Sequence, residues 1–288
     1  MEFIDKSKPE FKDNAHAIIK KFIDEQWQED ANQYVNLTYE SFNSRELKDL
    51  LLSEQGRRCC YCLKCLSDKE STIEHIIPNK VADPASFSDY DEFGEISTNV
   101  FVWMENKRFV KINTPPFPHI IAYENLVVSC NGYIPYEGNA KCCNNKRGMK
   151  TIIPLFYIPN VKEEFQYDEK GIIVCHEKYY DTIQILGLEN HTLQLFRRCW
   201  LNLPANYGIK DVYRANTDGM LRKEIVDDMD FVKVSLSDRT TILNQIYWNT
   251  FKNYCYFYRY NQAGIANGNN SINQSANYTN ISTILARD

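Results

Sequence analysis

The chain has 288 residues, of which 43% are hydrophobic and 25% are charged, and its formal net charge at pH 7 is −5. These values are typical of a globular protein that buries a sizeable core, as one large domain or two modest ones. The acidic balance argues against a protein that coats nucleic acid non-specifically. We expect a cytoplasmic protein with no membrane contact, because neither a signal-peptide pattern nor an apolar run of roughly 18 residues is visible.

Two packing helices are predicted at the start of the chain. From Asp13 to Trp27 the apolar residues recur at helical spacing, with charged residues between them. Asn43, followed three positions later by Glu46, resembles a capping box and predicts the start of a second helix. Gly56 is expected to end that helix and to lead directly into a group of cysteines.

Short strands and loops are predicted next. The segment from Thr72 to Ile77 is β-branched and is followed by Pro78, which favours a strand. A second apolar strand is expected from Asn125 to Cys130, and a helix from Asn144 to Lys150. The other expectations are a loop over residues 82–99, strands at Asn99–Trp103 and Phe109–Ile112, an extended connector at Thr114–Pro118 and an insertion at residues 131–141.

Beyond residue 151 the sequence predicts a supporting region. A hairpin is expected around Glu169–Gly171, and amphipathic helices are expected at Asn190–Leu203 and Asp238–Phe257. The aromatic face of the last helix is more typical of a core than of a base-stacking platform, although it is also our candidate for a partner-docking surface. Residues 261–283 are rich in Asn, Ser and Gly and indicate a flexible tail.

The predicted fold class is therefore α+β, with a small cysteine-rich core in a mainly helical surround. We divide the chain into N-terminal helices at 1–55, the core at 56–155, a helical supporting or docking region at 156–260 and the tail at 261–288.

The cysteines predict a structural metal site. Ten are present, and in a reducing compartment clustered C-x-x-C pairs are more often metal ligands than disulfides. Four thiolates favour Zn²⁺ in a closed tetrahedron. The predicted ligands are Cys59, Cys62, Cys130 and Cys143, with Cys65 and Cys142 as alternates and Cys60 as a bystander. Buried free thiols are the alternative explanation.

Glu74, His75 and Asn144 form a second candidate set with harder ligand atoms. Carboxylate and amide oxygens suit Mg²⁺ or Mn²⁺, so Glu74 and Asn144 are the predicted ligands. A neutral His75 could take a proton from water. In a regular strand Glu74 and His75 point to opposite faces, so one shared site requires the strand to end or bend there.

A basic cluster adjoins this set. Lys141, Lys146, Arg147 and Lys150 have no acidic residue among them. Of these, Lys146, Arg147 and Lys150 are the predicted contacts to a nucleic-acid backbone. A solvated charged surface without a ligand is the alternative explanation.

These segments resemble the HNH endonuclease family. The resemblance lies in CCYC followed by IEHIIPNK, in NLVVSC and in CCNNKRG, which matches the pattern C-N-x-x-K/R-G. It implies a ββα-metal core with a four-cysteine zinc knuckle. It also implies that His75 is the general base, that Glu74 and Asn144 hold Mg²⁺ or Mn²⁺, and that Asn125 orders the connecting loop.

Residues from about 44 to 203 further resemble the PtuB-like subgroup. The similar segments are ELKDLLLSEQGRRCCYC, IAYENLVVSC, IIPLF and TIQILGLENHTLQLFRRCW. Members of this subgroup accompany a PtuA-like ATPase in Septu and some retron anti-phage systems. The resemblance therefore implies a metal-dependent nuclease that acts on nucleic acid, with DNA as the expected substrate, as the effector of a defence complex. A zinc-stabilised module that binds nucleic acid or protein without catalysis is the alternative.

Overall fold

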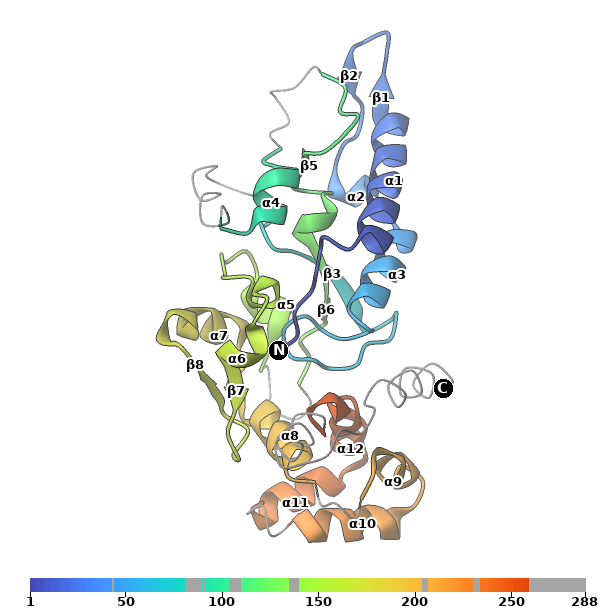
Figure 1. The fold of residues 1–288 in the computed structure, drawn as a ribbon. Coiled ribbons are helices and arrows are strands. Elements are labelled where there is room, and N and C mark those ends of the chain that lie inside the picture. Colours follow the sequence, from blue (N-terminus) through green and yellow to red (C-terminus); the bar gives the residue numbers. More distant parts are fainter. Residues whose placement is uncertain are drawn as a thin grey trace.

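The computed structural model describes residues 1–42, 44–80, 90, 92–103, 110–134, 140–203, 207–229 and 234–258. Within these residues the chain is a mixture of helices and short strands, and the strands pair into two-stranded sheets (Figure 1). The predicted tail at 261–283 lies outside the described residues.

The N-terminal region contains both predicted helices. Helix α1 (Pro9–Gln26) packs on α3 (Arg45–Glu54), and a hairpin of β1 (Trp27–Gln28) and β2 (Gln33–Tyr34) and a short α2 (Tyr39–Phe42) lie between them in the chain. The predicted capping residue was wrong: the Ser44 side chain caps α3 by accepting from the Leu47 N–H at 3.1 Å. Gly56, with φ +57°, follows the end of α3 as predicted.

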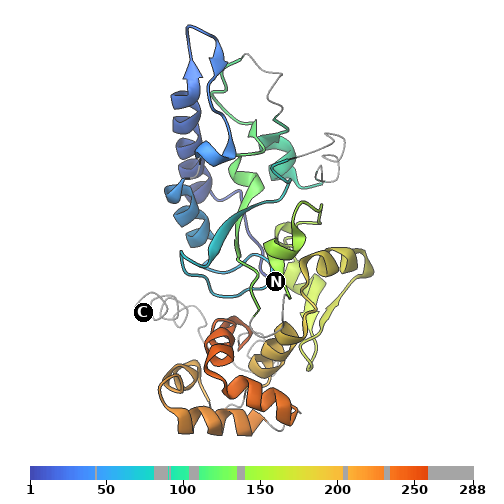
Figure 2. The same ribbon diagram turned by 180° about the vertical axis from the view of Figure 1, so that it is seen from behind.

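A strand pair lies at the centre of the molecule. Strand β3 (Ser71–His75) is antiparallel to β6 (Leu126–Cys130), with Ser71 opposite Cys130 and His75 opposite Leu126. The 3-10 turn η2 (Tyr123–Asn125) leads into β6, and α5 (Cys143–Arg147) packs against it. Figures 1 and 2 show the pair between α3 on one side and α5 on the other.

The second edge of β6 is occupied by side chains and a loop. Gln55 accepts from the Val128 N–H at 2.7 Å and donates to the Val128 carbonyl at 2.8 Å. Lys6 donates to the Leu126 carbonyl at 2.9 Å, and the Cys60 N–H donates to Val128 at 3.1 Å. These bonds satisfy buried backbone groups that a two-stranded sheet leaves unpaired.

Two predictions before β6 were wrong. Residues 94–99 form helix α4 (Gly94–Asn99) instead of a loop, and β4 (Val100–Phe101) pairs in parallel with β5 (Phe117–Pro118). Residues 110–112 form no strand, because the Ile112 N–H donates to the Tyr34 hydroxyl at 2.6 Å instead of to a neighbouring strand. The remainder of the predicted loop, at 82–89 and 91, and Phe109 lie outside the described residues.

The C-terminal region opens with two short helical turns, contains the predicted hairpin as β7 and β8, and continues as helices. Its elements are η3 (Leu155–Tyr157), α6 (Val161–Glu164), β7 (Phe165–Tyr167), β8 (Ile173–Cys175), η4 (Glu177–Tyr179), α7 (Tyr180–Leu186), α8 (His191–Leu201), α9 (Ile209–Arg214), α10 (Gly219–Asp228), α11 (Leu236–Leu243), α12 (Gln245–Lys252) and η6 (Cys255–Phe257). The predicted helix at 190–203 corresponds to α8, which Asn190 caps.

The predicted single helix at 238–257 is broken. Asn244 has extended backbone angles and its side chain accepts from the Ile246 N–H at 3.0 Å, so one helix ends and α12 begins there. The aromatic face is core: Phe251 is buried and stacks on Trp200 with ring centroids 4.7 Å apart. The suggested docking surface on this face is therefore wrong.

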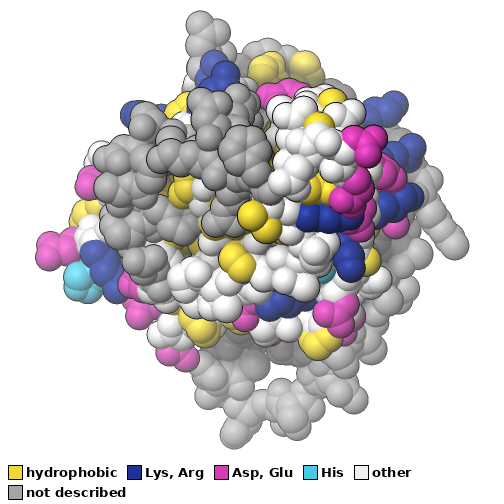
Figure 3. Space-filling model, turned by 90° about the horizontal axis from the view of Figure 1, so that it is seen from above, with side chains coloured by type: hydrophobic (Ala, Val, Ile, Leu, Met, Phe, Trp, Pro, Cys, Tyr) yellow, Lys and Arg dark blue, Asp and Glu magenta, His cyan; other side chains and the backbone are white. Residues whose placement is uncertain are grey.

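Within the described residues, no helix combines the length and apolar character needed to cross a bilayer. The end of the molecule that carries the β1–β2 hairpin shows basic side chains beside acidic ones on its described surface, without a continuous basic face (Figure 3).

Candidate functional site

Four buried cysteines from three separate segments meet beside the β3–β6 pair. The Sγ atoms of Cys59, Cys62, Cys130 and Cys143 all lie within 4.8 Å of one another. The Cys59–Cys143 and Cys62–Cys130 distances are both 3.8 Å. A tetrahedron with Zn–S bonds of about 2.3 Å has edges of about 3.8 Å. The geometry therefore fits the predicted zinc site.

The first half of the site is a tight knuckle after α3. Leu63 donates its N–H to the Cys59 carbonyl at 3.1 Å, and the Cys59 N–H donates to the Lys64 carbonyl at 2.9 Å. Leu63 holds this turn with φ +63°, a left-handed conformation that costs a non-glycine residue about 1 kcal/mol or more. A bound metal supplies the binding energy that offsets such strain.

The second half of the site consists of Cys130 and Cys143, which the insertion at residues 131–141 separates in sequence. Backbone contacts bring the two ends of this insertion together. Tyr133 and Lys141 form an antiparallel bridge, and the Cys142 N–H donates to the Gly132 carbonyl at 3.1 Å. Gly132 has φ +67°, and a Cβ there would lie 2.1 Å from the Cys142 carbonyl oxygen. The glycine thus permits the two ends of the insertion to meet, which brings Cys130 next to Cys143.

The alternate ligands lie outside this group of four. The Cys65 Sγ lies 3.9 Å from the Cys255 Sγ. Cys142, the residue that precedes α5, is not one of the four, although its thiol contacts those of Cys62, Cys130 and Cys143. Cys60 is buried against Val128 as a bystander, as predicted. Burial raises the pKa of the Cys143 thiol well above its usual value. A thiolate at Cys143 therefore requires a nearby cation, which is the condition that a zinc ion meets.

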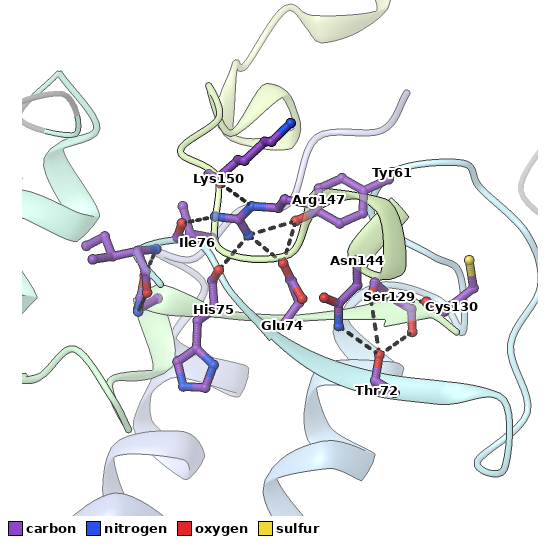
Figure 4. A network of polar contacts seen from close by, with 12 residues as sticks. Tyr61, Thr72, Glu74, His75, Ile76, Ser129, Cys130, Asn144, Arg147 and Lys150 are labelled. Carbon is purple, nitrogen blue, oxygen red and sulfur yellow. Dashed lines mark hydrogen bonds and ion pairs between the residues drawn. The ribbon is translucent and has the colours of Figure 1, made fainter. Parts of the chain in front are cut away.

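Glu74 points from β3 toward α5 and is engaged there (Figure 4). Its carboxylate accepts from Arg147 Nη1 at 2.5 Å and from the Tyr61 hydroxyl at 3.4 Å. Burial raises the pKa of Glu74 to about 7, while the Arg147 guanidinium opposes that shift. Arg147 is itself buried, and it also donates to the backbone carbonyls of His75, Ile76 and Lys150.

Arg147 is thus an internal clamp between α5 and the end of β3. The sequence suggested that it contacts a nucleic-acid backbone, and its position contradicts that expectation. Its exposed fraction is 1%, and the acceptors around it leave it no path to a phosphate in this conformation.

His75 projects from the opposite face of β3 (Figure 4). Strand β3 ends at His75, as one of the two conditions for a shared site requires, but it stays regular up to that residue, with Glu74 opposite Val127 and His75 opposite Leu126, so the two side chains remain on opposite faces. His75 Nε2 donates to the Ile120 carbonyl at 2.9 Å, and the Tyr39 ring meets the imidazole edge-on at 4.4 Å between centroids. Because a carbonyl only accepts, Nε2 carries the proton and Nδ1 is the basic nitrogen.

The Asn125 side chain connects the residues that follow β3 to the segment that contains His119. This side chain accepts from the Ile77 N–H at 2.7 Å and donates to the carbonyls of Ile77 at 3.0 Å and His119 at 2.7 Å. Because Asn125 is fully buried, these bonds fix the path of the chain after β3. The resemblance attributes this ordering role to Asn125.

Asn144 lies on the Glu74 side but makes a separate contact. Its Nδ2 lies 3.4 Å from the Thr72 hydroxyl. Glu74, Asn144 and His75 therefore do not converge on one point in this conformation. Lys146 and Lys150 are exposed and form no ion pair within the described residues.

The sequence did not single out two residues of this region. Tyr61 sits inside the first cysteine pair and contacts both Glu74 and Arg147. His119 is buried, accepts from the Trp103 N–H at 3.0 Å and donates to the Asn79 carbonyl at 3.2 Å. Tyr61 could have been found from its place between two ligands, whereas His119 has no local signal.

The comparisons with known proteins add no relative: no family model matches the sequence, and no curated protein or solved structure matches it.

Proposed function

We propose that the chain is an HNH-type nuclease that hydrolyses phosphodiester bonds, with DNA as the expected substrate. The proposal depends mainly on one arrangement: a zinc-ligand set of four cysteines holds two antiparallel strands and the following helix α5 together, with His75 at the end of the first strand. This order of elements is the one that the HNH resemblance implies, a ββα-metal core with a four-cysteine knuckle.

His75 is the proposed general base. Its Nδ1 is the nitrogen left to accept a proton, because Nε2 is committed to the Ile120 carbonyl. Burial lowers the pKa of His75 to about 4, so the imidazole is neutral at physiological pH. Water would transfer a proton to Nδ1 as its oxygen attacks phosphorus, and the bond from phosphorus to the leaving oxygen would break.

Mg²⁺ or Mn²⁺ is the cofactor that the resemblance implies, and such an ion would stabilise charge on the phosphate and the leaving oxygen. The expected ligands do not fit it as arranged here. The Glu74 carboxylate is occupied by Arg147, and the Asn144 amide contacts Thr72. We therefore assign no catalytic step to this ion.

Cleavage by the His75→Ala variant tests the proposal. With a labelled DNA strand and added Mg²⁺ or Mn²⁺, we expect the wild-type chain to cleave and the variant to lose at least about 100-fold in rate. Zinc content should not change, and His176→Ala, at an exposed histidine, should cleave like the wild type. Equal cleavage by His75→Ala and wild type would refute the catalytic assignment.

A binding module without catalysis is the second candidate. It is favoured by the fact that Glu74 and His75 lie on opposite faces of β3, with the carboxylate in an internal ion pair. In that case the zinc site and the exposed lysines would position nucleic acid or a protein. Binding by wild type and His75→Ala alike, with no cleavage by either under Mg²⁺ or Mn²⁺, would support this candidate.

We also propose a role as the effector of an anti-phage complex with a PtuA-like ATPase. The net charge of −5 is the supporting observation, because an acidic nuclease binds DNA weakly at physiological salt without help from a partner. Co-expression with the product of a neighbouring ATPase gene, followed by size-exclusion chromatography, would test it. Full activity of the lone chain would remove the need for the partner.

A further inference from the structure

A cavity of about 680 Å³ opens beside α5, between that helix and the α7–α8 connection. Its lining includes Lys141, Lys146 and Lys150 of the cysteine-rich core, and Gln184 and Ile185 of α7. The cavity is within the range of about 300–1,000 Å³ that is typical of sites for small organic ligands. It lies outside the strand pair and the zinc ligands.

The three lysines are available to a ligand. Each is exposed, and none forms an ion pair within the part of the chain that the structure describes. Arg147 lies between them in sequence but points inward, so the lysines alone supply positive charge to the cavity. Three ammonium groups that line one cavity and form no ion pair attract an anion.

The α7–α8 connection holds two of these lysines in place. Gly187 ends α7 with φ +63°, and a Cβ there would lie 2.5 Å from Lys146 Cδ and 2.9 Å from the Lys141 carbonyl oxygen. The lack of a side chain at Gly187 lets the Lys146 stem lie across the end of α7. The cavity is therefore built by contact between the cysteine-rich core and the region after it.

We propose that this cavity holds one nucleotide unit of a nucleic-acid strand, with its phosphates on the three lysines and its base against the partly buried Ile185. The Ile185 side chain suits the face of a base, and the exposed Gln184 amide can both donate to and accept from its edge. This inference rests on the proposed nuclease function, because the strand is that enzyme's substrate.

The charges in the cavity favour a strand over a free nucleotide. Asp181 and Glu189 also line it, so its anion capacity is smaller than three lysines alone would give. A phosphodiester carries one negative charge, whereas a terminal phosphate carries about 1.5 to 2 at neutral pH. The two carboxylates therefore disfavour the more highly charged terminal group.

The proposal can be tested with a fluorescein-labelled single-stranded DNA. Fluorescence anisotropy measures its binding constant K over a range of salt concentrations, without added Mg²⁺. Each lysine that neutralises a phosphate contributes roughly 0.7 to the slope of log K against log salt. Because one nucleotide unit is flanked by two phosphates, the variant with Lys141, Lys146 and Lys150 all changed to Gln should lower the magnitude of that slope by roughly 1.4. Lys150→Gln alone should lower it by roughly 0.7 without disturbing the Gly187 contact.

Lys20→Gln on α1 is the matched control, because Lys20 is exposed and distant in the chain. An unchanged slope in the triple variant, or an equal loss in the control, would overturn the proposal. A competition experiment with a deoxynucleoside monophosphate distinguishes a site for a nucleic-acid strand from a site for a free nucleotide. Competition as strong as that of the unlabelled strand would show that the site takes a free nucleotide and would also overturn the proposal.

The result is separable from the nuclease test. If the wild-type chain cleaves DNA and the lysine variants bind like wild type, only the cavity assignment fails. If the wild-type chain does not cleave DNA but the salt slope falls as expected in the lysine variants, the cavity assignment stands and the catalytic proposal fails.

Discussion

At the scale of single residues, the sharpest prediction concerns the four-cysteine site, because a cysteine outside this group provides a matched control. Cys130→Ser should lower zinc content from about one per chain to near zero and destabilise the fold, since one of four ligands is lost. Cys65→Ser should retain zinc, because Cys65 lies beside Cys255 and outside the group of four. Inductively coupled plasma mass spectrometry on purified protein measures the zinc content. Loss of zinc from Cys65→Ser and its retention by Cys130→Ser would mean that the ligands are misassigned.

His119 gives a prediction about pH. Burial lowers its pKa to about 4 from an ordinary value of about 6.5. Between these values the unfolded chain binds a proton that the folded chain does not, so the stability that His119 contributes is present above about pH 6.5 and is lost as the pH falls toward 4. The loss at pH 5 should be roughly 2 kcal/mol.

The variant His119→Asn separates this effect from other titrations. At pH 7.5 it should be less stable than the wild type, because the bonds to Trp103 and Asn79 are lost. At pH 5 that difference should narrow by roughly 2 kcal/mol in urea unfolding experiments. A difference in stability of constant size at both pH values would contradict the buried neutral imidazole.

At the scale of elements, the sequence predicted what local pattern determines. Helices α1 and α8 and strands β3 and β6 were predicted because their apolar spacing is contained in a few residues. The candidate ligands Cys59 and Cys62 could be predicted for the same reason, because both belong to one short C-x-x-C segment. The break at Asn244 was missed because an apolar spacing that continues across it hides a capping side chain.

Tertiary contacts decided what the sequence could not. Arg147 belongs to a run of basic residues that predicts a surface, and its burial depends on Glu74 and on carbonyls about seventy positions earlier. The disposition of Glu74 and His75 depends on whether β3 stays paired to its last residue, which no local pattern reports. The candidate catalytic residues could be listed from the sequence, but their arrangement could not.

The closure of the insertion can be tested at Gly132. Gly132→Ala would place a methyl group 2.1 Å from the Cys142 carbonyl oxygen, so the ends of the insertion would have to separate. We expect weaker zinc retention during dialysis against a chelator and a loss of stability of about 2 kcal/mol or more. Gly94→Ala is the control, because nothing lies within 4 Å of its added Cβ. Equal behaviour of the two variants would show that Gly132 does not govern the closure.

At the scale of the whole molecule, the four-cysteine site links regions that are far apart in the sequence. The Cys65 N–H donates to the Asn253 carbonyl at 2.7 Å, and the Arg58 guanidinium lies 4.5 Å from the centre of the Tyr256 ring. The Tyr254 hydroxyl lies 3.8 Å from the Cys62 sulfur. The last described turn of the chain therefore packs directly on the first zinc knuckle.

Removal of zinc should loosen both regions together. After treatment with a strong chelator, hydrogen exchange should speed up at residues 59–65, at β6 and at residues 253–257, because the knuckle turn loses the energy that holds it. Helix α1 is expected to keep most of its protection, since its buried residues pack on α3 and η2 instead of on the cysteines. If peptides covering 253–257 exchange at the same rate with and without zinc, the C-terminal turn folds independently of the metal, and the contacts at Cys65 and Tyr254 contribute little to its stability.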